Sequence, residues 1–247
     1  MEGRANSFTI RLADAVIRVH PMFPRAETLC RDYLTQDAPD FDVTITEADI
    51  QAERRYARRT ARAEQRKSAV YPDSYLETLA IYRKIAVQML NYDTVLFHGS
   101  AVALDGACYL FTAPSGTGKS THTRLWREYF GERAWMVNDD KPLLRLTEEG
   151  VLVWGTPWDG KHHLSRNAAV PLKAVCLLER DETNHIRPMS RREAFEVCMR
   201  QCYLPEEREQ MGQTLALMDG LLRSVPFYRL GCNMEPDAAR VAYEGMR

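Results

Sequence analysis

One stretch constrains this chain more than any other, because it joins an apolar run, a loop of small residues and a helix start. The run Leu110–Thr112 leads into Ala113-Pro114-Ser115-Gly116-Thr117-Gly118, and Lys119-Ser120-Thr121 follows. This order matches the phosphate-binding template G-x-x-x-x-G-K-[ST], except that Ala113 stands where the template has its first glycine. A strand, a tight loop and a helix in this order predict an α/β domain built around residues 113–118, which we call the glycine loop.

The residue types in and after the glycine loop suit a polyphosphate ligand. Small residues from Pro114 to Gly118 allow successive backbone N–H groups to approach phosphate oxygens, and a helix that starts at Lys119 directs its partial positive charge at the same place. Lys119 would contact the β- and γ-phosphates, and Ser120 would offer an oxygen to Mg²⁺. We therefore predict that residues 114–121 bind a nucleotide, ATP. The alternative is a chance glycine turn between a strand and a helix.

Paired carboxylates end the next apolar run along the chain. Trp135-Met136-Val137-Asn138 leads into Asp139-Asp140, and Asp139 lies 20 residues after Lys119. One carboxylate of such a pair can hold Mg²⁺, and the other can take a proton from an attacking hydroxyl. Beside a cation, two such groups would titrate as a coupled pair. The alternative is a polar strand end followed by a turn at Pro142.

Two hairpins are predicted around these motifs. In the first, residues 95–104 form an apolar run, Asp105-Gly106 is a turn signal, and residues 107–112 return into the glycine loop. His98 lies in the first run, where a lone histidine among apolar residues is more often structural than catalytic. The second hairpin, residues 143–146 and 151–154, leads into an irregular segment over 155–163, and irregular loops on rigid strand ends often carry binding groups.

The segment 155–163 holds three candidate substrate contacts. Trp158 could stack on a base or line an acceptor pocket, and Lys161 or His162 could neutralise a transferred phosphate. The alternative is a sharp connection that contains a packed tryptophan. The residue types do not separate these two interpretations.

Two domains are expected, a small α+β cap over residues 1–70 and a domain over 71–247 that bears the glycine loop. Within the cap, Arg54, Arg58, Arg62 and Arg66 fall at helical spacing, which suits either an acidic docking partner or a solvated helix face. The remaining predicted elements are a hairpin at 7–20, a helix at 26–34, a strand at 41–45, a helix capped by Ser74 and Glu77, a strand at 174–178, a helix capped by Ser190 and Glu193, a helix at 207–225, a strand at 228–230 and a helix at 236–243.

Composition excludes several classes of partner. A formal net charge of −1 over 247 residues argues against a nucleic-acid or membrane partner. No apolar run approaches the roughly 20 residues that cross a bilayer, and Met1–Ser7 is polar, unlike a signal peptide. The six cysteines are scattered in apolar surroundings, which suggests reduced thiols, and we expect a cytoplasmic protein.

The hairpin with His98-Gly99, the glycine loop and Asp139-Asp140 together resemble the kinase domain of bacterial HPr kinase/phosphorylase, which shares its core with phosphoenolpyruvate carboxykinase. The likeness covers about residues 95–180. The whole chain, with its segment from Gly155 to Lys161, resembles small stand-alone HPr-kinase-like proteins. The resemblance implies a mixed α/β P-loop core with antiparallel pairs, flanked by helices. In that core Asp140 would be the base, His98 its partner, Asp139 and Ser120 would lie near Mg²⁺, and Lys119 would contact phosphate.

The resemblance also implies an activity, the transfer of the γ-phosphoryl group of ATP to a hydroxyl acceptor. The acceptor could be a serine of a peptide or protein, or a small molecule, and a homo-oligomer is compatible with the family. Three other functions stay open. They are carboxykinase chemistry on a keto acid, the reverse phosphate-driven dephosphorylation, and a nucleotide-binding regulatory or peptide-carrier module without kinase turnover.

Overall fold

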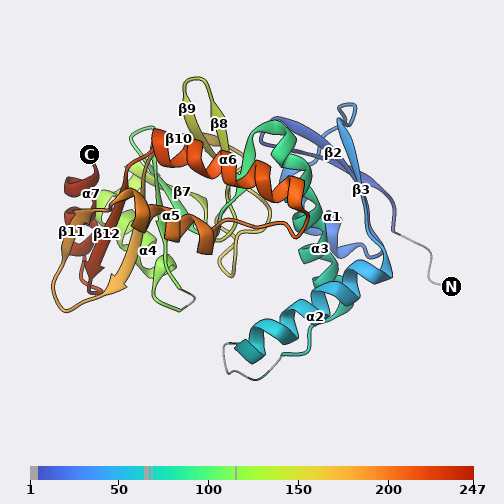
Figure 1. The fold of residues 1–247 in the computed structure, drawn as a ribbon, viewed down its shortest axis with the longest axis horizontal. Helices are drawn as coiled ribbons and strands as arrows, with labels where there is room; N and C mark the ends of the chain where they lie inside the picture. Colours follow the sequence, from blue (N-terminus) through green and yellow to red (C-terminus); the bar gives the residue numbers. More distant parts are fainter. Residues whose placement is uncertain (1–4, 64–66, 68, 115) are drawn as a thin grey trace. The chain divides into compact units, whose positions relative to one another are not determined.

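The computed structural model describes residues 5–63, 67, 69–114 and 116–247, and it divides into an N-terminal unit, Met1–Gln88, and a C-terminal unit, Met89–Arg247 (Figure 1). Ser115 of the glycine loop and Arg66 of the basic stretch lie outside the described residues. The units divide at a different place from the expected domains because the helix α3 (Asp73–Gln88) contacts α2 (Glu47–Ala63). The expected boundary at residue 70 stays a prediction.

The N-terminal unit carries a three-stranded sheet in the order β1-β2-β3. The predicted hairpin forms β1 (Phe8–Leu12) and β2 (Ala15–His20), and β3 (Phe41–Thr44) lies parallel to β2. The predicted helix at 26–34 is shorter than expected, with α1 at Arg25–Leu29 and a 3₁₀ turn at Arg31–Tyr33.

Two sequence predictions in the N-terminal unit have different outcomes. The described part of the basic stretch is helical, since Arg54, Arg58 and Arg62 lie within α2, where Arg54 pairs with Asp73. The capping box at Ser74 and Glu77 is wrong. The helix α3 begins at Asp73, and the buried Glu77 carboxylate instead accepts hydrogen bonds from the backbone N–H groups of Met22 and Phe23. These N–H groups need a partner inside the fold, and the carboxylate supplies it.

The C-terminal unit is built on one mixed sheet of nine strands. Its main order is β4-β8-β9-β10-β6-β5-β7, with β12 paired to β10 and β11 to β12. The strands are β4 (Thr94–Leu96), β5 (Ser100–Leu104), β6 (Ala107–Thr112), β7 (Ala134–Asn138), β8 (Leu143–Thr147), β9 (Gly150–Trp154), β10 (Ala169–Arg180), β11 (His185–Pro188) and β12 (Phe227–Cys232).

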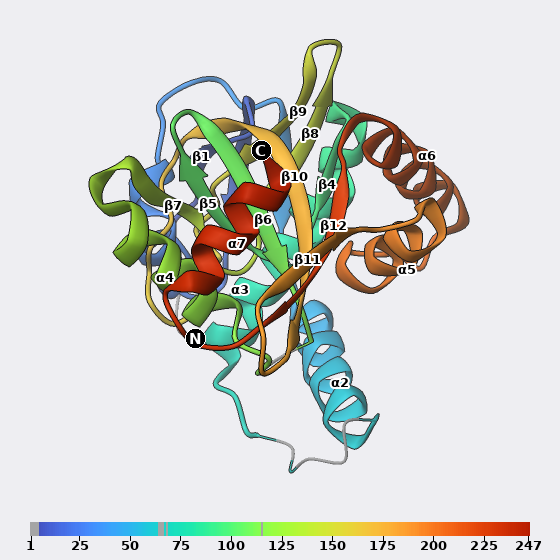
Figure 2. The ribbon, with the colours of Figure 1, turned by 90° about the vertical axis from the view of Figure 1, so that its left-hand side faces the viewer.

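Helices cover both faces of this sheet (Figure 2). One face packs against α4 and α7, and the other against α5 and α6. Alternation along β6 sets this arrangement, because Leu110 faces the core beneath α5 and α6 while Phe111 faces the core beneath α4 and α7. The helical segments of the unit are α4 (Lys119–Phe130), α5 (Arg191–Gln201), α6 (Arg208–Ser224), α7 (Asp237–Met246) and the 3₁₀ turns Met89–Tyr92 and Gly131–Arg133.

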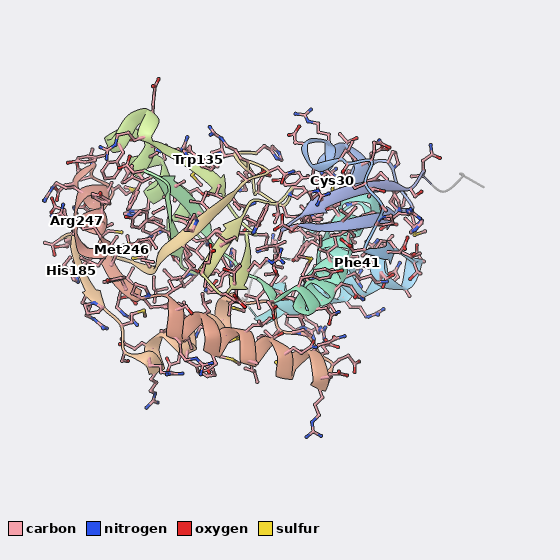
Figure 3. The ribbon with its side chains drawn as sticks, turned by 90° about the horizontal axis from the view of Figure 1, so that it is seen from above. Cys30, Phe41, Trp135, His185, Met246 and Arg247 are labelled. Carbon is pink, nitrogen blue, oxygen red and sulfur yellow. The ribbon has the colours of Figure 1, made fainter. Side chains whose placement is uncertain are left out.

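The end of α7 packs into the core of the C-terminal unit. Met246 is buried in the core beneath α4 and α7, and α7 contacts β11, which bears His185 (Figure 3). Thus the predicted mixed α/β fold is confirmed in its coarse form, a mixed sheet flanked by helices. The predicted capping box of Ser190 and Glu193 is also confirmed, at the start of α5.

Residues 95–104 do not form the single strand expected from their apolar character. The chain leaves β4, which pairs with β8, and enters β5, which pairs with β6 and β7, so that His98 and Gly99 lie between two strands. A Cβ on Gly99 would lie 2.8 Å from Leu110 Cδ1 and 3.0 Å from the Phe111 carbonyl oxygen. Glycine therefore permits the close approach to β6, and this crossing brings His98 beside the end of that strand.

Candidate phosphoryl-transfer site

The glycine loop connects β6 to α4, as predicted. Gly116 and Gly118 have φ angles of +79° and +125°, which L-residues rarely adopt, so both positions favour glycine. Ala113 is not among the described residues with positive φ, and the template's first glycine is therefore not needed for backbone reasons. The Lys119 ammonium lies over the loop and donates to the Ala113 carbonyl oxygen at 3.1 Å.

An aromatic cluster fixes the start of α4 on β6. The His122 ring meets Phe111 edge-on with centroids 4.6 Å apart, and Trp126 Nε1 donates to His122 Nε2 at 3.1 Å. Burial lowers the pKa of His122 to about 3, so the ring is neutral and Nε2 can accept this bond. These contacts fix the first turn of α4 against β6.

The acid pair follows β7 in a turn that Asn138 holds. The Asn138 Oδ1 atom accepts from the backbone N–H groups of Asp140 and Lys141, at 2.8 and 2.7 Å. The two carboxylates then have different surroundings. The Asp139 side chain is buried, whereas that of Asp140 is 35% exposed.

Two cationic or titratable groups hold one oxygen of Asp140. His98 Nε2 lies 3.3 Å and Lys141 Nζ 3.4 Å from Asp140 Oδ1, and among the described residues Oδ2 has no partner. Burial raises the pKa of Asp140, but the hydrogen bond from His98 and the charge of Lys141 outweigh it, and the pKa lies below its ordinary value. Asp140 is therefore ionised at neutral pH, with one oxygen free to accept a proton.

His98 is held in place from two sides through its backbone. Its N–H donates to the Gln201 carbonyl oxygen at 2.8 Å, and its carbonyl accepts from Thr112 Oγ1 at 3.0 Å. Thr112 is the last residue of β6, directly before the glycine loop. Burial lowers the pKa of His98 below its ordinary value, although its bond to Asp140 opposes the shift.

A line of hydroxyl groups, which we call the hydroxyl chain (Ser100 and Thr123), joins the acid pair to α4. Ser100 Oγ donates to Asp139 Oδ1 and lies 3.2 Å from Thr123 Oγ1, which in turn lies 3.3 Å from the Ser120 carbonyl oxygen. Ser100 and Thr123 are both buried. The chain couples the first turn of α4 to Asp139 without solvent between them.

Lys119 and the acid pair act on one another. Burial lowers the pKa of Lys119, and the charges of Asp140 and Asp139 oppose this shift. The hydroxyl chain and the contact between His98 and Asp140 bring the predicted residues His98, Asp139 and Asp140 near the first turn of α4, which holds the predicted residues Lys119 and Ser120. Pro114, Gly116, Thr117, Gly118 and Thr121 line two cavities that border the glycine loop.

The segment 155–163 packs against the acid-pair turn. A Cβ on Gly155 would lie 2.0 Å from the Arg166 carbonyl oxygen, and a Cβ on Gly160 would lie 3.5 Å from Asp140 Cβ. The Trp158 side chain is buried, in keeping with a packed tryptophan. Lys161 and His162 follow Gly160 and are exposed. Their roles toward substrate stay predictions.

Two cavities border the glycine loop. One, of about 530 Å³, lies between Gly116, Thr117, the end of β10 and the end of α5. The other, of about 500 Å³, lies toward Thr121 and His122 and the residues after β12. Arg180 lines both, and its guanidinium donates to the carbonyl oxygens of Gly116 at 2.7 Å and Thr117 at 3.4 Å.

Several of these contacts were missed from the sequence. Ser100 and Thr123 carried one signal, a polar side chain within an apolar run or helix face. Asn138 carried another, since it directly precedes the acid pair. Arg180 and Gln201 gave no signal, because each simply ends a regular element and only the sheet order brings it to the loop or to His98.

No helix among the described residues has the length and apolar character that crossing a membrane would require. In the same residues, no group of three or more His, Cys, Asp or Glu side chains is placed to hold a metal ion.

Comparison with known proteins identifies a family and a solved structure of low similarity. The family model described as SynChlorMet cassette protein ScmC matches residues 73–237, more than half of the chain. The structure of the Hpr(Ser) kinase/phosphatase from Coxiella burnetii is similar at 8% sequence identity and a TM-score of 0.37, covering 60% of this chain and 94% of that one. Curated proteins gave no match.

Proposed function

The chain belongs to the SynChlorMet cassette protein ScmC family, and we propose that it is a kinase that transfers the γ-phosphoryl group of ATP to a hydroxyl acceptor. In this proposal the sheet and glycine loop form a phosphoenolpyruvate carboxykinase-like P-loop core. One observation supports the proposal, namely that the hydroxyl chain links Asp139 to the first turn of α4, the helix that begins at Lys119.

The residues divide the chemistry between them. The backbone N–H groups of the glycine loop and the Lys119 ammonium would bind the β- and γ-phosphates. Asp140 Oδ2 would take the proton as the acceptor oxygen forms its bond to the γ-phosphorus, the bond from that phosphorus to the bridging oxygen breaks, and ADP leaves with the electron pair. His98 and Lys141 hold Asp140 Oδ1, so they orient the base and keep it ionised.

Mg²⁺ fits the donor set of this site. Ser120 and Asp139 offer hard oxygen atoms, and an ion bound mainly by phosphate oxygens and water needs only one or two protein ligands. The lack of a larger cluster among the described residues is consistent with such a site. When bound, the ion would neutralise charge on the phosphates.

The test separates base from binding residue. Asp140→Asn should lower the transfer rate by about 10² to 10⁴-fold, the usual contribution of a general base, with little change in ATP affinity. Lys119→Ala should weaken both. Transfer is measured with γ-labelled ATP, Mg²⁺ and panels of serine peptides and small hydroxy compounds, followed by mass spectrometry.

Asp105→Asn is the matched control. Asp105 lies in the exposed β5–β6 turn and pairs with Arg133, and asparagine tolerates the positive φ of this position as well as aspartate does. Full turnover in Asp140→Asn would contradict the assignment of the base. Slow ATP hydrolysis without transfer to any acceptor would instead favour a regulatory or carrier module.

A further inference from the structure

The cavity of about 530 Å³ beside the glycine loop is lined by both apolar and basic residues. Leu177, Leu178 and Val197 supply apolar wall, and Arg180, Arg200 and Arg229 supply guanidinium groups. Its volume of about 530 Å³ is within the range of small-ligand sites. Apolar walls with a few convergent polar groups are typical of sites that bind an amphiphilic organic ligand.

The positive charge in this cavity exceeds the negative charge. Arg229 is neutralised, because it pairs with Glu179 and lies 3.5 Å from Glu193. Arg180 donates to two uncharged carbonyl groups of the glycine loop, and within the described part of the chain Arg200 makes no ion pair. Arg180 and Arg200 therefore line the cavity without a carboxylate partner among the described residues.

The position of the cavity connects the phosphate loop to the base. On one side it is lined by Gly116 and Thr117, and on the other by Gln201, whose carbonyl oxygen accepts the N–H of His98. His98 in turn contacts Asp140. A ligand that fills the cavity would contact Gln201. The Gln201 carbonyl oxygen binds the backbone of His98, and the His98 side chain contacts the proposed base, Asp140.

From this arrangement we propose that the cavity binds the hydroxyl acceptor of the kinase, and that this acceptor carries a carboxylate which Arg200 and Arg180 recognise. The inference rests on the proposed function and adds the chemical class of its second substrate. Guanidinium groups bind carboxylates through paired, charge-assisted hydrogen bonds, which suits this role. In the proposed function the loop and Lys119 bind the nucleotide phosphates, which leaves for the acceptor the Arg200 guanidinium and the Arg180 terminal nitrogen that donates to neither loop carbonyl.

The experiment uses acceptor pairs that differ only in charge. One series holds acetylated serine peptides with aspartate or asparagine beside the serine, and the other holds small hydroxy acids and their amides. The two series distinguish a peptide from a small molecule as the source of the carboxylate. For each pair, kcat/KM is measured with the full chain, ATP and Mg²⁺, together with the ATP affinity.

The variant is Arg200→Gln, and the matched control is Arg192→Gln, on the same helix α5 but 90% exposed beside Glu196. The acidic member should be preferred by about tenfold or more, the effect of one charge-assisted hydrogen bond. Arg200→Gln should remove the preference through KM and leave ATP affinity unchanged, whereas Arg192→Gln should keep it. Arg200→Lys should retain part of it. A general loss of folding would lower both members of a pair alike and leave their ratio intact.

Four results would overturn the inference. Transfer without preference for the acidic member, or a preference that Arg200→Gln leaves intact, would do so while the proposed kinase function stands. ATP binding without transfer to any member of either series would exclude the cavity as an acceptor site. Absence of both ATP binding and transfer would remove the proposed function itself, and the inference with it.

Discussion

Removing the Ser100 hydroxyl tests whether the hydroxyl chain joins the helix α4 to the acid pair. In Ser100→Ala the buried Asp139 carboxylate loses its donor, and the new side chain fits the same space. A hydrogen bond to a charged group contributes about 1.5–3 kcal/mol, so we expect the free energy of unfolding to fall by that amount at pH 7. Thr123 keeps its contacts to its own helix carbonyls, and the loss is therefore local to Asp139.

Urea unfolding followed by tryptophan fluorescence measures this loss in the right part of the chain. All 4 tryptophans lie in the C-terminal unit, at positions 126, 135, 154 and 158, so the signal reports on the unit that bears the site. A cycle of Ser100→Ala, Asp139→Asn and the double variant isolates the pair. We expect a coupling energy of at least about 1 kcal/mol.

Thr123→Val examines the middle of the hydroxyl chain. Its matched control is Thr214→Val, because Thr214 is also buried in a helix and its hydroxyl also donates to the carbonyl four residues before it. Thr123→Val should cost about 0.5–1.5 kcal/mol more than the control, the worth of one neutral hydrogen bond. The cycle of Ser100 and Asp139 has its own refuting result. A coupling energy below about 0.3 kcal/mol lies within ordinary additivity and would mean that the hydroxyl chain does not link the acid pair to α4 energetically. The proposed function would then lose its main support.

Two further predictions concern packing and pH. Gly155→Ala would place a Cβ 2.0 Å from the Arg166 backbone oxygen and should destabilise the C-terminal unit by about 3 kcal/mol or more. Gly212→Ala is the control, because a Cβ there would meet nothing within 4 Å and should stabilise the helix slightly. Urea unfolding compares the two variants. His122 has a pKa of about 3 in the folded state and about 6.5 unfolded, so the unfolded state binds more protons between these values. Its contribution to stability is present above about pH 6.5 and falls, by at most about 1.4 kcal/mol per pH unit, as the pH drops toward 3. His122→Gln should flatten this slope, and an unchanged slope would show that the ring is not the group that titrates.

Identical capping patterns with opposite outcomes show where sequence reasoning succeeds. Ser190 and Glu193 form their capping box at a helix start, although the Glu193 carboxylate also binds the Arg187 guanidinium, because its oxygens can accept from Arg187 and from Ser190 together. Ser74 and Glu77 have the same spacing, but the Glu77 carboxylate binds the backbone of Met22 and Phe23 instead. A local pattern predicts a local contact only where no distant polar group has a stronger need for the same atoms.

The positions of the glycine loop and the acid pair after strands were predictable, because each is a compact motif whose residue types indicate one kind of chemistry. The hairpin turn at Asp105-Gly106 was predictable for the same reason, and both residues adopt positive φ. Ser100, by contrast, belongs to a strand whose other residues are apolar, and its partner Asp139 is 39 residues away. Only the pairing of β5 with β7 brings the two together, and neither segment alone predicts that pairing.

Asn138 shows how one buried amide organises the site. Its oxygen accepts the N–H groups that start the turn of the acid pair, and its Nδ2 donates to the Thr156 carbonyl oxygen at 3.0 Å. An aspartate could accept but not donate, and a leucine could do neither, so only an amide satisfies both the turn and the segment 155–163. The tract Asn138-Asp139-Asp140 thus holds three similar side chains with separate tasks. The first fixes the backbone, the second accepts from Ser100 of the hydroxyl chain, and the third contacts His98 through one oxygen and keeps the other without a partner among the described residues.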